Sequence, residues 1–99
     1  MSDESGILPR LMAVIEDRKR RRPAGSYTVE LFNGGVERIG AKVAEEAAEV
    51  IEAAAAAEFS REHVIHEAAD VLYHLFVLLA HCDVALAEVE AELQRRFAP

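Results

Sequence analysis

Cysteine is scarce in this sequence, and this scarcity indicates the kind of cellular compartment in which the protein is found. Cys82 is the one cysteine among 99 residues, so no disulfide can form within the chain. A lone cysteine fits a reducing compartment. The first six residues, from Met1 to Gly6, also lack the basic start and the apolar run of a secretory signal. We therefore expect a cytoplasmic protein.

Long hydrophobic runs and an excess of positive charge are missing as well. The apolar stretch from Val71 to Ala80 is interrupted by Tyr73 and His74, and it is too short to cross a bilayer. The formal net charge is −7, and such an acidic chain is a poor candidate for binding nucleic acid through its phosphates. We expect no membrane and no nucleic acid as partner. A phosphorylated ligand would need a divalent cation to offset the repulsion between charges.

Strand signals and glycine-rich phosphate loops are nearly absent. The segment from Ser26 to Phe32 has some β-branched and aromatic character, but it is short and lies between prolines and glycines. It is typical of a turn followed by the start of a helix. The Gly34-Gly35 pair is too short to open a phosphate-binding loop. These absences leave an all-α fold.

Helical periodicity accounts for most of the chain, and 99 residues suffice for one domain, residues 1–99. Short connections between helices imply antiparallel neighbours, so we expect an antiparallel bundle of four to five helices. Much of the apolar fraction is alanine, which buries little area and favours oligomerisation. The predicted helices are Ile7 to Arg20, a short helix from Thr28 to Phe32, Val36 to Ala57, Arg61 to His81 and Leu86 to Arg96.

Acidic residues follow the edge of the apolar face on the second long helix. With about 100° per residue, Lys42, Glu46 and Glu49 fall within about 60° of one another. Glu45 and Arg38 lie beside them. A single acidic pair at this spacing is more often a solvated helix face, and Lys42 with Glu46 is an ordinary pair one turn apart.

A second acidic stripe lies on the third predicted helix. The same construction places Glu67, Asp70, His63 and His74 within about 60° of one another, at the edge of that helix's apolar arc. If the two helices pack antiparallel, their carboxylates converge and repel one another unless a cation lies between them. Carboxylate oxygens suit Mg²⁺ or Mn²⁺, and Arg38 and Lys42 could contact phosphate oxygens. Spacing alone leaves the metal site and the solvated face open.

Histidines and the basic run offer weaker alternatives. No glutamate is followed three residues later by histidine, which disfavours a di-iron bundle. His66, Asp70 and His74 are spaced to hold zinc, although a hydrogen-bonding or surface role is commoner. The basic run from Arg18 to Arg22 could bind an anion, but such a run is usually a solvated helix end.

The acidic stripes form part of a longer pattern. Glu45, Glu46 and Glu49, followed by Glu67 and Asp70, resemble the EExxE…ExxD signature of the all-α nucleoside triphosphate pyrophosphohydrolase superfamily, which includes MazG and the dimeric dUTPases. Other residues narrow the resemblance to the phosphoribosyl-ATP pyrophosphohydrolase family of histidine biosynthesis, over about Ile7 to Arg96. They are Ser26, Tyr27, Thr28, Leu31, Phe32, Gly35, Arg38, Ile39, Lys42, Tyr73 and His74.

The resemblance implies a reaction and its participants. The family hydrolyses phosphoribosyl-ATP between the α- and β-phosphates, giving phosphoribosyl-AMP and pyrophosphate, with Mg²⁺ and with Mn²⁺ as an alternative. In many bacteria this activity is fused to the cyclohydrolase of the next step; 99 residues cannot hold both, so we expect the stand-alone form, as a homodimer.

The resemblance also assigns roles by position. It implies Glu46, Glu49, Glu67 and Asp70 as metal ligands, and Glu45 and Glu46 as catalytic, with Glu45 either a further ligand or the group that deprotonates water. It implies substrate binding by Arg38, Lys42, Ser26, Tyr27, Thr28, Tyr73 and His74. Asp83 and Ala85 depart from relatives that have a glycine and a small hydroxyl residue there, which weakens the cap of the last helix.

Two other functions stay open at this point. The same chemistry could act on another nucleotide, as in a MazG-like or dUTPase-like enzyme. The chain could also be a helical interaction module without catalysis, in which case the acidic stripes would be dispensable.

Overall fold

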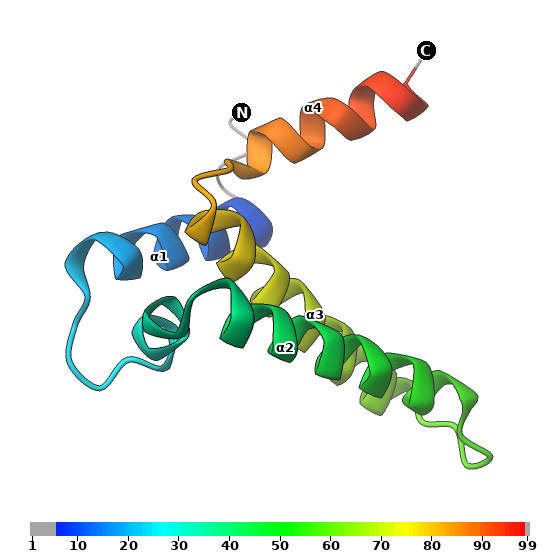
Figure 1. The fold of residues 1–99 in the computed structure, drawn as a ribbon. Helices are drawn as coiled ribbons and strands as arrows, with labels where there is room; N and C mark the ends of the chain where they lie inside the picture. Colours follow the sequence, from blue (N-terminus) through cyan, green and yellow to red (C-terminus); the bar gives the residue numbers. More distant parts are fainter. Residues whose placement is uncertain (1–5, 99) are drawn as a thin grey trace.

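The computed structural model describes residues 6–98, which form four helices joined by short loops (Figure 1). The helices are α1 (Ile7–Arg21), α2 (Tyr27–Ala55), α3 (Arg61–His81) and α4 (Leu86–Phe97). No strand occurs within this range, so the all-α prediction is confirmed, with four helices. Residues 1–5, where no secretory signal is recognised, lie outside the described residues.

Helix α2 contains the break that the sequence predicts at Gly34-Gly35. A short helix and a long helix were expected on either side of this pair, and Gly35 has a non-helical backbone (φ 70°, ψ −167°) that kinks α2 between them. Only glycine adopts this backbone conformation at low cost. At the start of α2 the Ser26 hydroxyl caps the helix by accepting a hydrogen bond from the Val29 amide at 3.3 Å.

The predicted end of α2 at Ala57 was wrong by two residues. The helix ends at Ala55, and Ala56 has an extended backbone (φ −62°, ψ 139°). Alanine favours helix, but here the chain must leave the helix to reverse direction before α3. The bounds of α3 agree with prediction, and its N-cap is Ser60, whose hydroxyl accepts from the His63 amide at 3.3 Å.

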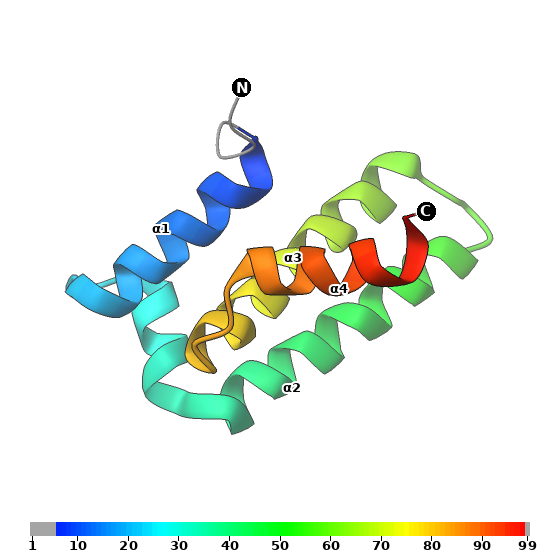
Figure 2. The same cartoon turned by 90° about the horizontal axis from the view of Figure 1, so that it is seen from above.

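The core lies at one end of the α2–α3 pair, where α1 packs across both helices (Figures 1 and 2). Its fully buried side chains come from three helices: Ile15 of α1, Leu31 and Ile39 of α2, and Val77 of α3. Beyond this core, α2 and α3 continue side by side as an antiparallel helical hairpin (Figure 2). The predicted carboxylates lie on this hairpin.

Helix α4 stands apart from the other three and has no buried residue (Figure 1). Asp83 lies in the loop between α3 and α4 (φ 59°), and its carboxylate pairs with Lys19 Nζ at 2.7 Å. Ala85 precedes α4 without a side-chain cap, but its amide donates to Glu88 Oε2 at 2.9 Å. The projecting helix gives a radius of gyration of 15.0 Å, against about 13 Å for a compact domain of this length.

Helix α3 is the one helix in residues 6–98 that is long and apolar enough to cross a membrane by length and composition. Core helices of helical bundles share these properties. In this fold α3 packs on both α1 and α2, and its buried side chains include those of Glu67 and His74.

Candidate functional site

The second long helix places three carboxylates together. Glu45, Glu46 and Glu49 each offer an oxygen within 4.8 Å of the others. Glu46 is buried, with 6% of its surface exposed, whereas Glu45 is exposed. The spacing of three and four residues on α2 produces this arrangement, because such residues lie one turn apart on the same side of a helix.

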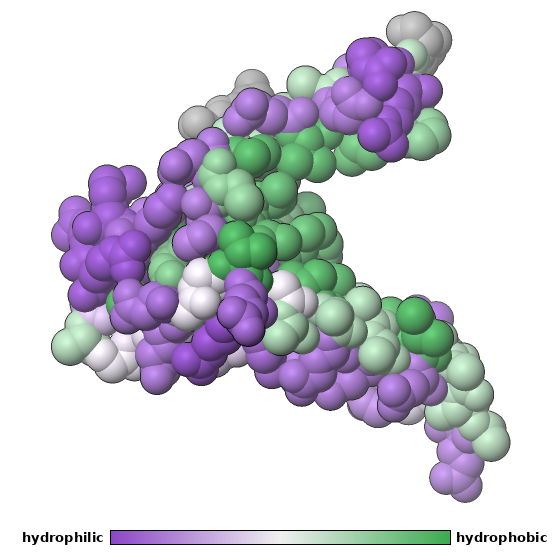
Figure 3. Space-filling view, in the orientation of Figure 1, coloured by the Kyte–Doolittle hydropathy of each residue, from purple (hydrophilic) through white to green (hydrophobic). Residues whose placement is uncertain are grey.

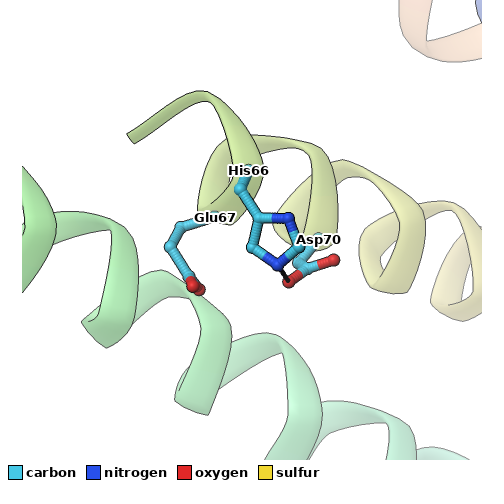
Figure 4. A group of neighbouring side chains, drawn as sticks. All are labelled: His66, Glu67 and Asp70. Carbon is cyan, nitrogen blue, oxygen red and sulfur yellow. Dashed lines mark ion pairs between the residues drawn. The ribbon is translucent and has the colours of Figure 1, made fainter. Parts of the chain in front are cut away.

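A second group lies on α3 and comprises His66, Glu67 and Asp70 (Figure 4). Glu67 extends from α3 toward α2 and is buried, while Asp70 lies beside His66, whose Nε2 is 3.4 Å from Asp70 Oδ2. His63 Nε2 lies 3.4 Å from Glu67 Oε1. Sequence reasoning did not include His66 in the acidic stripe, although its separation of four residues from Asp70 was a signal for this contact.

The two carboxylate groups meet where α2 packs on α3. The Glu49 carboxyl group lies beside that of Glu67, and this neighbour is the largest cause that raises the pKa of Glu49 above its ordinary value. A smaller opposing effect comes from Glu46. A pocket of about 350 Å³ opens beside this contact, lined by Glu49, Glu52, Ala53, Ala56, His63 and Glu67.

Two buried oxygens in this cluster indicate what it can hold. Glu46 Oε2 and Glu67 Oε2 are the only buried side-chain polar atoms in residues 6–98 without a hydrogen-bond partner. Leaving such oxygens unpaired in the interior is costly. A hard divalent cation fits this donor set, since carboxylate oxygens from two helices are the ligands that Mg²⁺ and Mn²⁺ prefer.

Lys42 supplies positive charge at the edge of the cluster. Its ammonium group lies 3.5 Å from both Glu45 Oε2 and Glu46 Oε1. Burial alone would lower the pKa of Lys42, but Tyr27, Glu45 and Glu46 outweigh that effect and raise it. Arg38, one turn earlier on α2, is exposed, and no ion pair engages it among the described residues. Both cations are therefore available to anionic groups near the carboxylates.

The other predicted substrate-binding residues form a separate cluster at the start of α2. The Tyr27 hydroxyl lies 3.0 Å from His74 Nε2, and the buried Thr28 hydroxyl is hydrogen-bonded to the Tyr73 hydroxyl. Tyr73 and His74 rings pack edge to face at 5.0 Å. Burial is the largest cause that raises the pKa of Tyr73. Ser26 belongs to this segment as the helix cap, with its hydroxyl directed to the backbone.

The structure does not assemble the alternative zinc site. His66 and Asp70 are in contact, but His74 Nε2 is bonded to Tyr27, so these three residues do not form a zinc site. In the basic run from Arg18 to Arg22, Lys19 donates to the Ala80 carbonyl at 2.8 Å and to Asp83. The arginines of the run are engaged with Asp17 or Asn33.

Comparison with known proteins agrees with this geometry. Residues 8–97 match the family model described as phosphoribosyl-ATP pyrophosphohydrolase. A phosphoribosyl-ATP pyrophosphatase of Rhodopirellula baltica is 52% identical over 90 residues, which are 90% of this chain and 75% of that protein. One of Geobacter sulfurreducens is 46% identical over 97 residues, 98% of this chain and 88% of that protein. The histidine biosynthesis bifunctional protein HisIE of Pyrococcus furiosus is 48% identical over 90 residues, 91% of this chain and 41% of that protein.

Proposed function

Because this chain belongs to the phosphoribosyl-ATP pyrophosphohydrolase family, we propose that it hydrolyses phosphoribosyl-ATP between the α- and β-phosphates in histidine biosynthesis, with Mg²⁺. The products are phosphoribosyl-AMP and pyrophosphate. The observation that supports the metal dependence is the pair of buried, unpartnered oxygens, one on Glu46 of α2 and one on Glu67 of α3.

Four carboxylates are proposed as the metal ligands, from both helices: Glu46, Glu49, Glu67 and Asp70. A bound Mg²⁺ neutralises polyphosphate charge and lowers the pKa of a bound water. Glu45 is exposed and its carboxylate lies within 4.8 Å of the other two on α2, so it is proposed to accept the proton of the attacking water. Glu46 is proposed to orient the Glu45 carboxylate through Lys42, because the Lys42 ammonium group contacts the carboxylates of both glutamates.

Phosphate binding is assigned to the two cations on α2. Lys42 offers an ammonium group beside the carboxylates, and the exposed Arg38 offers a planar guanidinium group one turn away. The substrate's phosphates would therefore lie along α2, from the carboxylates toward Tyr27. This orientation brings the ribose and adenine groups of the substrate to the end of the site where Tyr27, Thr28, Tyr73 and His74 gather.

Pyrophosphate release tests the proposal. The protein should release pyrophosphate from phosphoribosyl-ATP with Mg²⁺ or Mn²⁺ and not with a chelator. Glu49→Gln and Asp70→Asn should each lower kcat at least about a hundredfold, as loss of a metal ligand or of its supporting contacts typically does. Glu58→Gln, in the loop after α2, is the matched control and should keep wild-type turnover. Full turnover by both Glu49→Gln and Asp70→Asn would rule out the assigned ligands.

A substrate panel separates the alternatives. Cleavage of canonical deoxynucleoside triphosphates in preference to phosphoribosyl-ATP would indicate a MazG-like or dUTPase-like enzyme instead. Absence of cleavage of every nucleotide in the presence of Mg²⁺ would support an interaction module. The aromatic cluster at the start of α2 favours phosphoribosyl-ATP, because triphosphate binding alone needs only the carboxylates and the cations.

We also propose that the protein acts as a homodimer, in the cytoplasm. The projecting α4 lacks any buried residue, and apolar side chains on its concave side continue onto α3 (Figure 3). The exposed fractions are 49% for Leu93, 77% for Phe97 and 61% for Ile65. A second copy that packs between α4 and α3 would bury this surface, which a monomer leaves in water.

Sedimentation tests the dimer. The wild-type chain should sediment as a dimer at micromolar concentration. Leu93→Lys or Phe97→Lys places a charge among the exposed apolar side chains of α4 and should shift the equilibrium from dimer to monomer. Ala91→Lys adds the same charge to the opposite side of α4 and should leave the dimer intact. A wild-type monomer, or equal effects of all three variants, would contradict the proposed interface.

A further inference from the structure

We propose that His74 is a positioning residue, which holds the Tyr27 hydroxyl as an acceptor of hydrogen bonds from the substrate's ribose hydroxyls or adenine amino group. This inference rests on the proposed function. It changes the expected role of His74, which does not contact the substrate, and it specifies that of Tyr27, which does not bind phosphate.

The first step concerns the hydrogen on His74 Nδ1. This atom lies 2.8 Å from the backbone carbonyl oxygen of Asp70, one turn earlier on α3. A carbonyl oxygen only accepts hydrogen bonds, so Nδ1 carries the proton. In a neutral imidazole the other ring nitrogen, Nε2, is then an acceptor. The backbone of Asp70 thus fixes the tautomer of His74.

The second step follows at Tyr27. Its hydroxyl lies 3.0 Å from His74 Nε2, and an acceptor nitrogen requires that the hydroxyl donates. Once this hydrogen is committed, the phenolic oxygen offers only lone pairs to any other partner. Phosphate oxygens have no hydrogen to give at neutral pH. Tyr27 is therefore unsuited to phosphate, and it suits a hydroxyl or amino group.

The surroundings keep the imidazole in place. His74 is buried, with 5% of its surface exposed, and the rings of Tyr27 and Tyr73 both lie edge to face with it, at 6.0 and 5.0 Å. Tyr73 is held in turn by Thr28. By contrast, 42% of the surface of Tyr27 is exposed. The tyrosine is thus the accessible member of the pair, and the histidine acts only through it.

The position of Tyr27 decides which substrate group it meets. It is the first residue of α2, and its proximity to Lys42 is one of the causes that raise the pKa of that lysine. Lys42 also contacts Glu45 and Glu46, so this lysine lies near both Tyr27 and the carboxylates of α2. A substrate whose phosphates lie between the metal ligands and Lys42 presents its sugar or base, rather than a further phosphate, to Tyr27.

Steady-state kinetics with four variants test the proposal. Tyr27→Phe and His74→Leu should each raise KM for phosphoribosyl-ATP about fivefold, the loss expected for one hydrogen bond, with a smaller change in kcat. The double variant should be no worse than either single variant, because both remove the same contact. His74→Gln, whose amide oxygen can accept from Tyr27, should recover most of the loss. Additive effects, or no recovery with glutamine, would overturn the positioning role.

Nitrogen NMR of the wild-type protein supplies a readout independent of activity. The ring of His74 should show a protonated Nδ1 and an unprotonated Nε2 at neutral pH. A proton on Nε2 would overturn the inference, because Tyr27 would then be free to donate to phosphate. If the protein does not cleave phosphoribosyl-ATP at all, the proposed function fails, and the NMR result still decides the tautomer.

Discussion

Glu46 and Glu67 show at the scale of single residues why a cation matters to this fold. Both are buried where α2 meets α3, and each has one oxygen paired with a neighbouring side chain and one without a partner among residues 6–98. Charged groups buried in this way destabilise a protein unless they are compensated. The cation-free protein therefore carries an energetic cost at its site that ligand binding removes.

Mg²⁺ should accordingly stabilise the protein against unfolding. At a concentration one hundred times its dissociation constant, a ligand that binds only the folded state adds about 2.7 kcal/mol. Thermal unfolding with Mg²⁺, and with a chelator, measures the effect. Glu67→Gln should lose most of the Mg²⁺-dependent increase in Tm. An equal increase in wild type and Glu67→Gln would place the cation elsewhere.

The pH dependence of stability should also reflect Glu49. The pKa of Glu49 is raised in the folded protein above its ordinary value of 4.5. Protonation of Glu49 therefore stabilises the folded state, and this contribution is fully present below pH 4.5. The contribution is lost as the pH rises through the pKa that Glu49 has in the folded protein. In the presence of a chelator, the free energy of unfolding of Glu49→Gln should depend less on pH than that of wild type as the pH rises above 4.5. Urea denaturation over this range measures the difference; parallel curves would contradict it.

At the scale of elements, the sequence predicted helices better than their joints. The third helix was predicted to both ends because Ser60 caps it and its apolar residues recur regularly. The kink in α2 was predicted as a break between two helices at Gly34-Gly35, and the backbone of Gly35 confirms it. The carboxylates were found from their spacing along each helix. The Tyr27–His74 contact joins residues 47 apart, so no local pattern reveals it.

The kink makes a direct prediction for two glycines of α2. Gly35 has a positive φ, so Gly35→Ala should destabilise the protein by about 1–3 kcal/mol through backbone strain. Gly40 lies in regular helix with open space around it, and Gly40→Ala should be neutral or stabilise by up to about 1 kcal/mol. Urea denaturation of both variants measures the contrast. Equal effects would show that the kink is not required.

Lys19 ties α1 to the end of α3. Its ammonium group donates to the Ala80 and His81 carbonyls at 2.8 and 3.3 Å and pairs with Asp83. Lys19→Met should therefore cost about 1–3 kcal/mol, because two carbonyls at a helix end lose a charged donor. Arg20→Met removes a cation from an exposed pair on the same helix and should cost less than about 1 kcal/mol. Urea denaturation midpoints of Lys19→Met and Arg20→Met, each compared with wild type, measure the two losses of stability.

At the scale of the whole molecule, three helices share a core and the fourth projects from it. No stretch of sequence predicts this separation, because the apolar stripe of α4 is equally compatible with packing inside the same chain. A second copy of the chain would supply the missing contacts. The melting temperature should then rise with protein concentration over the micromolar range. A melting temperature independent of concentration would favour a monomer that tolerates its exposed stripe.

The aromatic cluster at the start of α2 gives the protein an optical property. The chain has no tryptophan and two tyrosines, and both tyrosines, Tyr27 and Tyr73, belong to this cluster. Tyrosine emission from the folded protein therefore originates in this cluster alone. Titration of the unlabelled protein with a nucleotide that absorbs little at the excitation wavelength would report occupancy of the site directly, without a probe and without turnover.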